Sequence, residues 1–284
     1  MISDGIITTV DPASNGSDFV DFLKWGVPLI IAVVALAQPW IIGLYQRFVR
    51  RAAIDVYEAG TIEICYASAG TTISLQGTLR AIHTDQFIRE ISLRLVRLHD
   101  RSQHDLEWAA FHPVGAQVSA SATPTIEVPA GFLLTVGSPH RFRIQFMDPV
   151  VFTEIGALLD QLRTDWGNAL LAAYGGSITE NLDPATAQSI TDQAYAEFNG
   201  APSTLNAYGE LDRRCYWDAG DYSLTMTVST ARPERSFSRT WRFSIAQGDV
   251  DRLRLNRVGV LAQVAGRMTG QYNFVYAKYE EPRG

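Results

Sequence analysis

The chain has 284 residues, of which 46% are hydrophobic and 19% are charged. This is the composition of an ordinary folded protein, and it excludes a disordered, collagen-like or low-complexity chain. The 24 Lys and Arg residues are outnumbered by 30 Asp and Glu residues, which gives a formal charge of −6. Because a protein that binds nucleic acid through its phosphates needs a surplus of positive charge, we expect no nucleic-acid polymer as a partner.

An uncharged stretch near the amino terminus predicts a helix that spans a lipid bilayer. Residues 25–46 contain 22 consecutive residues without a charge. A helix of that length covers about 33 Å, which is enough for the hydrocarbon core of a membrane. Phe22 and Trp25 stand at one end and Tyr45 and Phe48 at the other, where aromatic rings prefer the headgroup region. A buried core helix of a soluble protein is the alternative, but such a helix rarely lacks a polar face over this length.

Basic residues after the stretch predict its orientation. Arg47, Arg50 and Arg51 follow it, whereas Lys24 alone precedes it in an otherwise acidic leader. Since positive charge stays on the cytoplasmic side, we expect residues 1–24 outside and everything after the span in the cytoplasm. The sequence therefore predicts a single-pass protein of the inner cell membrane, with residues 47–52 as a basic linker.

Two features inside the span need an interpretation. Ala35-Leu36-Ala37 matches the small-residue pattern that signal peptidase cleaves, and cleavage there would export the rest of the chain. The long acidic leader and the apolar run beyond this point favour an uncleaved anchor. Gln38 and Pro39 predict a kink, because proline lacks an N–H and its ring clashes with the carbonyl group of Ala35.

After residue 52, hydrophobic and polar residues alternate. This pattern is typical of antiparallel strands with one buried and one solvated face. The clearest runs are 61–66, 91–95, 141–146, 222–228 and 241–245. Further strands are expected at 72–82, 106–112, 131–136, 252–260 and 272–279.

A helical pattern interrupts the strands at residues 149–199. Asp148-Pro149 and Asp183-Pro184 each read as a helix N-cap followed by proline at the first helical position. Hydrophobic residues then recur at helical spacing in both segments. We expect two helices inserted into the β body, which spans residues 53–284, and we expect them to brace that body.

The run Asp218-Ala219-Gly220-Asp221-Tyr222-Ser223-Leu224 resembles a signature of the immunoglobulin fold. In that family the tyrosine hydroxyl bonds to backbone upstream, which implies a tyrosine corner at Tyr222. Leu224 stands where the family usually has cysteine, so the resemblance implies no inter-sheet disulfide there. The expected fold is mainly β: a transmembrane helix followed by an antiparallel, immunoglobulin-like β-sandwich. The whole layout also resembles bacterial single-pass membrane proteins, which implies no activity.

The sequence contains no recognisable catalytic or phosphate-binding motif. His99, His104 and His112 offer imidazole ligands for a metal, but their irregular spacing favours a solvated hairpin, so we expect no metal and no other cofactor. Cys65 and Cys215 lie far apart and form no CxxC pair. Two reduced, buried thiols are expected, and a single long-range disulfide is the alternative.

Arg80, Arg89, Arg94 and Arg97 suggest a basic stripe on one sheet face. Such a stripe would bind a small anionic ligand, for example a phosphate-bearing nucleotide. The competing interpretation is that the arginine stems cover sheet surface while their charged ends pair with nearby acids, and it is the one we favour.

Together these features predict a membrane-anchored, non-enzymatic protein. We expect it to bind a partner protein, a second copy of itself or a ligand at the cytoplasmic face. The alternative is a sensor whose β domain recognises a small signal and acts through the kinked span. An enzyme whose motif cannot be read from the sequence is the third hypothesis.

Overall fold

The computed structural model describes residues 27–48, 53–112, 128–175, 182–231, 234–267 and 271–280. The chain divides into two compact units, Met1–Arg51 and Ala52–Gly284. In the first unit, residues Val27–Phe48 form helix α2. By length and composition α2 can cross a membrane, since Val27–Tyr45 has a mean hydropathy of 2.2 and none of that window is buried.

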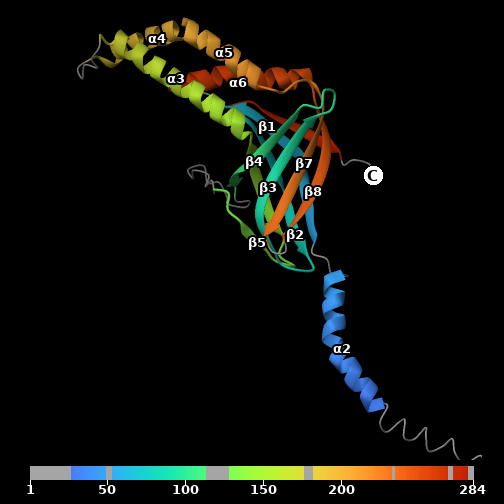
Figure 1. Cartoon of the computed structure of the whole chain (residues 1–284). Helices are drawn as coiled ribbons and strands as arrows, with labels where there is room; N and C mark the ends of the chain where they lie inside the picture. The colour runs from blue at the N-terminus through green and yellow to red at the C-terminus, as the bar shows by residue number, and fades with distance from the viewer. Residues whose placement is uncertain are drawn as a thin grey trace, which may run out of the picture. The chain divides into compact units, whose positions relative to one another are not determined.

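Helix α2 continues through Pro39 without ending. Figure 1 shows that it bends partway along its length. Proline removes one intrahelical hydrogen bond, which is a sufficient cause for such a bend. Arg47 lies in the last turn of α2, whereas Arg50 and Arg51 lie outside the described residues.

The second unit is built on nine described strands. They are β1 (Ala53–Ala67), β2 (Gly70–Ile82), β3 (Gln86–Arg97), β4 (Gln103–His112), β5 (Phe132–Leu134), β6 (His140–Met147), β7 (Gly220–Ala231), β8 (Glu234–Ile245) and β9 (Phe274–Glu280). Neighbours follow the order β4-β6-β2-β1-β9-β8-β7-β3, and β3 pairs back onto β4. Eight antiparallel strands therefore form a closed barrel, and β5 adds to β3 (Figure 1).

The predicted immunoglobulin-like sandwich is wrong. A sandwich consists of two separate sheets that face each other, whereas the pairing of β3 with β4 joins these strands into one ring. The physical reason for the error is that alternation shows which side chains point inward. It does not show whether the sheet closes.

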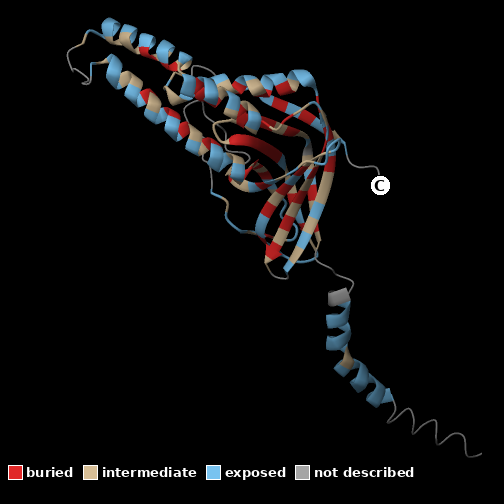
Figure 2. Ribbon diagram, turned by 45° about the horizontal axis from the view of Figure 1, so that its top comes forward, coloured by how far each residue is buried: buried red, intermediate tan, exposed pale blue. Residues whose placement is uncertain are grey.

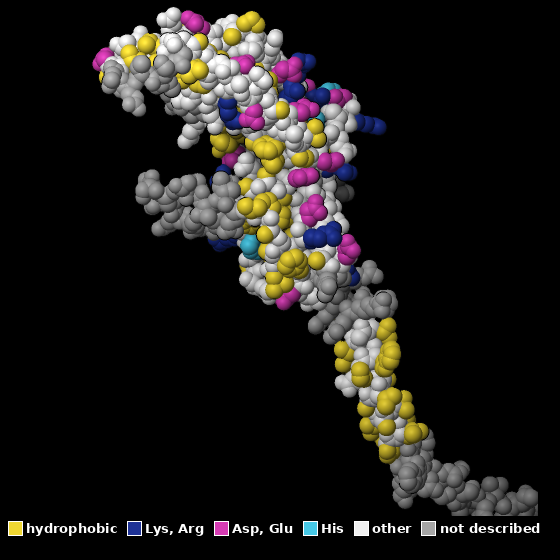
Figure 3. All heavy atoms as spheres, turned by 60° about the vertical axis from the view of Figure 1, so that its left-hand side comes forward, with side chains coloured by type: hydrophobic (Ala, Val, Ile, Leu, Met, Phe, Trp, Pro, Cys, Tyr) yellow, Lys and Arg dark blue, Asp and Glu magenta, His cyan; other side chains and the backbone are white. Residues whose placement is uncertain are grey.

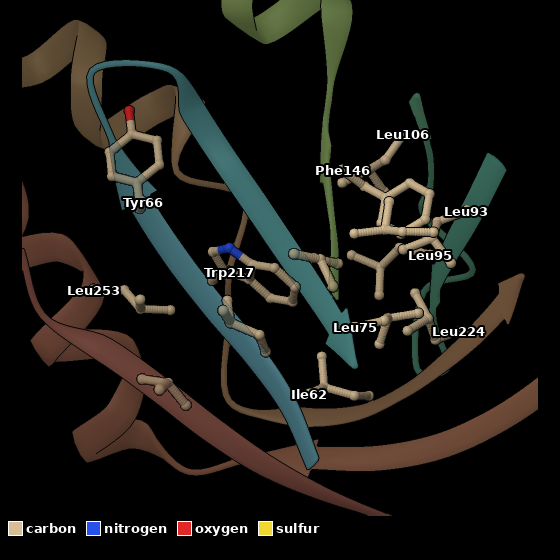
Figure 4. Packing of buried hydrophobic residues seen from close by; sticks show 14 of the residues in the cluster. Ile62, Tyr66, Leu75, Leu93, Leu95, Leu106, Phe146, Trp217, Leu224 and Leu253 are labelled. Atoms are coloured by element: carbon tan, nitrogen blue, oxygen red, sulfur yellow. The ribbon is translucent and has the colours of Figure 1, made fainter. Parts of the chain in front are cut away.

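The barrel interior is filled with hydrophobic side chains. Figure 4 shows Leu75, Leu93, Leu95, Phe146 and Leu224 gathered between the strands, and each is at most 1% exposed. An eight-stranded barrel has an interior about wide enough for side chains alone. The core therefore runs through the middle of the ring.

Four helices accompany the barrel: α3 (Pro149–Ala173), α4 (Pro184–Gly200), α5 (Pro202–Arg214) and α6 (Gln247–Val264). Figure 1 shows them at one end of the barrel, with α3 and α4 extending beyond it. In Figure 2 the buried residues of α3 form a stripe along one side, and they are Ile155, Leu159, Leu162 and Trp166.

The predicted helix starts are confirmed. The carboxylate of Asp148 accepts hydrogen bonds from the N–H groups of Val150 and Val151, at 3.0 and 3.1 Å. Asp183 accepts one from the N–H of Thr186 at 3.2 Å. The insertion nevertheless contains a third helix, α5, which the sequence analysis did not predict.

The strand predicted at 252–260 is also wrong, because these residues belong to α6. The alternation of Leu253 and Leu255 with arginine suggested a strand. In the structure Leu253, Val260 and Leu261 are buried at helical spacing, whereas Leu255 is 61% exposed. A segment this short fits both the two-residue period of a strand and the 3.6-residue period of a helix.

Replacing Phe146 with alanine tests the packed interior. Phe146 is fully buried in the ring, so Phe146→Ala should lower the free energy of unfolding by about 3–5 kcal/mol, measured by chemical denaturation in detergent. Phe152→Ala is the control, since Phe152 on α3 is 43% exposed. Equal losses in the two variants would show that the interior is not packed as described.

Candidate functional site

The four predicted arginines do not form one cationic face. Arg89, Arg94 and Arg97 lie on β3, but Arg80 lies on β2, which is not a neighbour of β3 in the barrel. The guanidinium of Arg94 is 2.8 Å from Asp105, and that of Arg89 is 3.3 Å from Glu234. Arg97 pairs with two carboxylates, those of Asp100 and Asp218. Three of the four arginines therefore form ion pairs with acidic side chains.

Tyr222 makes the local contact that the resemblance implied. Its hydroxyl donates a hydrogen bond to the carbonyl oxygen of Asp218 at 2.8 Å and accepts one from the N–H of Asp218 at 2.9 Å. The Asp218 carboxylate also lies 3.1 Å from Arg254 of α6. These contacts fix the turn before β7 to the end of the barrel and to α6.

The histidines are placed apart. The ring of His104 stacks on Tyr216 with centroids 3.6 Å apart, and its Nδ1 lies 3.6 Å from an oxygen of Asp148. His99 has a 59% exposed side chain, and the side chain of His112 lies outside the described part of the structure. Among the described residues, no group of three or more His, Cys, Asp and Glu side chains is placed to bind a metal ion.

Both cysteines are buried free thiols. Burial raises the pKa of Cys65 to about 12 and that of Cys215 to about 11. Because the thiolate is the reactive form of cysteine, neither residue is suited to act as a nucleophile at neutral pH.

The barrel wall is interrupted where β3 stops pairing with β4 and pairs with β5 instead. Ser92–Val96 of β3 pair with β4, but Gln86–Ile88 pair with β5. The residues of β4 after Glu107 pair with β6 and no longer with β3. Pro129, Ala130 and Gly131, which precede β5, line a hollow together with residues of β3 and β4.

Four rings gather at the opening: Trp108 and Phe111 of β4, Phe132 of β5 and His140 of β6. The Phe132 and His140 rings stack at 4.6 Å, and the Phe111 and Phe132 rings meet edge to face at 6.0 Å. With Val128, Ala130 and Gly131, the four rings line a cavity of about 160 Å³. An apolar cavity of about 150 Å³ accommodates benzene, so this one has room for a single ring-sized group.

Trp108 contributes a buried hydrogen-bond donor to the lining residues. Its indole nitrogen, Nε1, forms no hydrogen bond with any described residue. A buried donor without an acceptor costs about 1–3 kcal/mol, so such atoms are rare in native structures. The indole nitrogens of Trp217 and Trp241 are likewise buried without a hydrogen-bond acceptor among the described residues, and Trp108 in addition lines the cavity.

A second hollow of about 200 Å³ adjoins the first, and Trp108, Ala130 and Gly131 line both. Arg89, Glu90 and Glu107 add charge to it. Gly131 is required between the two hollows, since a Cβ there would lie 2.7 Å from the ring of Phe87 and 2.9 Å from the carbonyl oxygen of Ile88.

This cavity was not predicted from the sequence. Trp108, Phe111 and Phe132 lie in strands that were predicted at 106–112 and 131–136, and His140 directly precedes the predicted run at 141–146, but no spacing in the sequence indicates that these strands meet. No protein-family model, curated protein or solved structure matches the chain. The cavity is therefore interpreted from its own geometry.

Removal of the Tyr222 hydroxyl tests the turn at Asp218. Tyr222→Phe keeps the buried ring and loses its hydrogen bonds, so the free energy of unfolding should fall by about 1–2 kcal/mol. Calorimetry or chemical denaturation would measure the loss. A variant as stable as the parent would show that these hydrogen bonds contribute nothing.

The environment of His104 predicts a pH dependence of stability. Burial lowers the pKa of His104, although the nearby Asp148 opposes the shift. The unfolded chain therefore binds this proton more tightly, and stability should fall as the pH drops through about 6.5, the pKa of an unfolded histidine. His104→Phe keeps a ring against Tyr216 and should lose less stability between pH 8 and pH 5. An equal or larger loss in the variant would contradict the assignment.

Proposed function

We propose that the chain is a membrane-anchored binding protein whose barrel holds a ring-sized apolar group with a hydrogen-bond acceptor. The observation that carries the proposal is a cavity lined by four rings, one of which, Trp108, has a buried Nε1 that no described residue accepts a hydrogen bond from. Binding sites are typically apolar concavities with a few polar atoms that fix orientation, and this cavity has that character.

The chemistry of the cavity indicates what it accepts. Aromatic rings pack favourably at centroid distances of 4.5–7 Å, and the cavity rings are already arranged in this way. A guest ring continues that packing, and its acceptor atom accepts a hydrogen bond from the N–H of Trp108. A small aromatic molecule and an aromatic side chain of a partner protein both present this group.

The anchoring part of the proposal rests on α2. Its length and hydropathy suit a bilayer, and the basic residues Arg47, Arg50 and Arg51 support a cytoplasmic barrel. The alternative, a sensor of a small anion, receives no support from the arginines of β3, because carboxylates already pair with them.

Benzamide is a suitable probe, because it joins one ring to one carbonyl acceptor. The full chain is placed in lipid nanodiscs with its six tryptophan side chains labelled with ¹⁵N. The Trp108 indole signal is identified by its absence in Trp108→Phe. We expect benzamide to shift this signal saturably, with a dissociation constant on the order of 1 mM, as is usual for so small a ligand.

Controls separate the ring from the acceptor and the cavity from the surface. Acetamide has the acceptor without the ring and should leave the signal unchanged. Ala130→Leu fills the cavity and should abolish the benzamide shift, whereas Ala157→Leu, on an exposed position of α3, should preserve it. A Trp108 signal that does not respond to benzamide, or that responds equally in Ala130→Leu, would refute the proposal.

A further inference from the structure

One rim of the barrel carries exposed apolar side chains. At the end where β1 begins, Phe87 is 43% exposed, Leu133 is 58% exposed and Val136 is 48% exposed. Phe87 and Leu133 face each other across β3 and β5, and Val136 is bridged to Ala81 near the end of β2. Strand pairing thus places the three side chains close together at this end of the barrel. Figure 3 shows hydrophobic side chains gathered on the lower barrel on the side that carries β5.

Two unpaired arginines flank these side chains. Arg80 directly precedes Ala81 on β2, and Arg141 of β6 lies opposite Thr78 of the same strand. Both are exposed, and neither forms a hydrogen bond or ion pair with any described residue. Their neighbours Leu79 and Phe142 are fully buried, so strand alternation directs both arginines outward.

The acids near this rim are largely engaged in other contacts. Asp55 lies opposite Arg80 on β1 and accepts a hydrogen bond from the Tyr57 hydroxyl at 3.1 Å. Asp85 accepts one from the N–H of Val136 at 2.8 Å. The patch therefore combines apolar side chains with two positive charges that form no ion pair with a described residue.

A short connection joins α2 to β1, the strand that begins at this rim. Residues 49–52 separate Phe48, the end of α2, from Ala53, the start of β1. Even fully extended, this connection spans only about 18 Å. If α2 is inserted in a bilayer, the rim stays near its surface, and even a weak contact with lipid will be populated.

We propose that the rim patch, formed by Phe87, Leu133, Val136, Arg80 and Arg141, lies on the anionic surface of the bilayer that holds α2. This inference rests on the membrane anchoring in the proposed function. The apolar side chains enter the boundary between headgroups and acyl chains, and the two guanidinium groups bind lipid phosphates. Because Leu133 follows Phe132, the contact also brings the aromatic cavity close to the lipid.

Fluorescence quenching in nanodiscs tests the contact on the full chain. Both native cysteines are buried, so a bimane label can be directed to Leu133→Cys in the patch. Leu255→Cys on α6 is the matched control, since Leu255 is 61% exposed, close to the 58% of Leu133, and belongs to a helix at the other end of the barrel (Figure 1). Lipids with a nitroxide headgroup should quench the label at 133 at least threefold more than the label at 255.

The charge requirement is tested in the same discs. The double variant Arg80→Ala/Arg141→Ala, and discs without anionic lipid, should each reduce quenching at 133 and leave quenching at 255 unchanged. Equal quenching at the two positions would refute the contact between the patch and the bilayer. Quenching at 133 that does not depend on lipid charge would refute the binding of the patch to anionic lipid. A chain that does not enter the discs at all would refute the anchoring itself, which separates that failure from the failure of the rim contact.

Discussion

The structure depends on the way β3 shares one edge between two partners. Residues Ser92–Val96 pair with β4 and close the ring, whereas Gln86–Ile88 pair with the three residues of β5. A strand edge with unpaired N–H and C=O groups is unfavourable when buried and prone to aggregation when exposed, so β5 is needed where β4 departs. Because β5 is so short, the wall beside it remains open. The aromatic cavity and the exposed patch both lie at this place.

The packed interior explains why the candidate sites lie in the wall and at the rim. Larger barrels enclose a lumen that can hold a ligand, whereas this ring of eight strands is filled by its own side chains. His104 of β4 joins the barrel to the start of α3, because it stacks on Tyr216 and approaches the N-cap Asp148. The helices thus pack at one end of the barrel, and the exposed patch of Phe87, Leu133 and Val136 lies at the opposite end.

Much of the local structure could be predicted from the sequence, because alternation and helix caps are local signals. Closure of the sheet could not, since it depends on pairings between distant strands. Tyr222 illustrates this limit. Its hydroxyl forms the local hydrogen bond that the resemblance implied, but its strand belongs to a barrel and not to a sandwich. The cavity was missed for a related reason. Trp108 and Phe132 stand 24 positions apart, and only the short strand β5 brings their rings within 6.2 Å.

Disulfide formation between β3 and β5 directly tests the pairing of these two strands. Phe87 and Leu133 are paired across these strands, and side chains so paired have Cβ atoms about 4.5–5.5 Å apart, within reach of a disulfide after small adjustments. The account predicts that Phe87→Cys/Leu133→Cys forms an intramolecular disulfide under mild oxidation, detected by mass spectrometry. Phe87→Cys/Val136→Cys, which is out of register, should remain reduced. Failure of the first pair to cross-link, or equal cross-linking of both pairs, would contradict the shared edge of β3 and the open wall that follows from it.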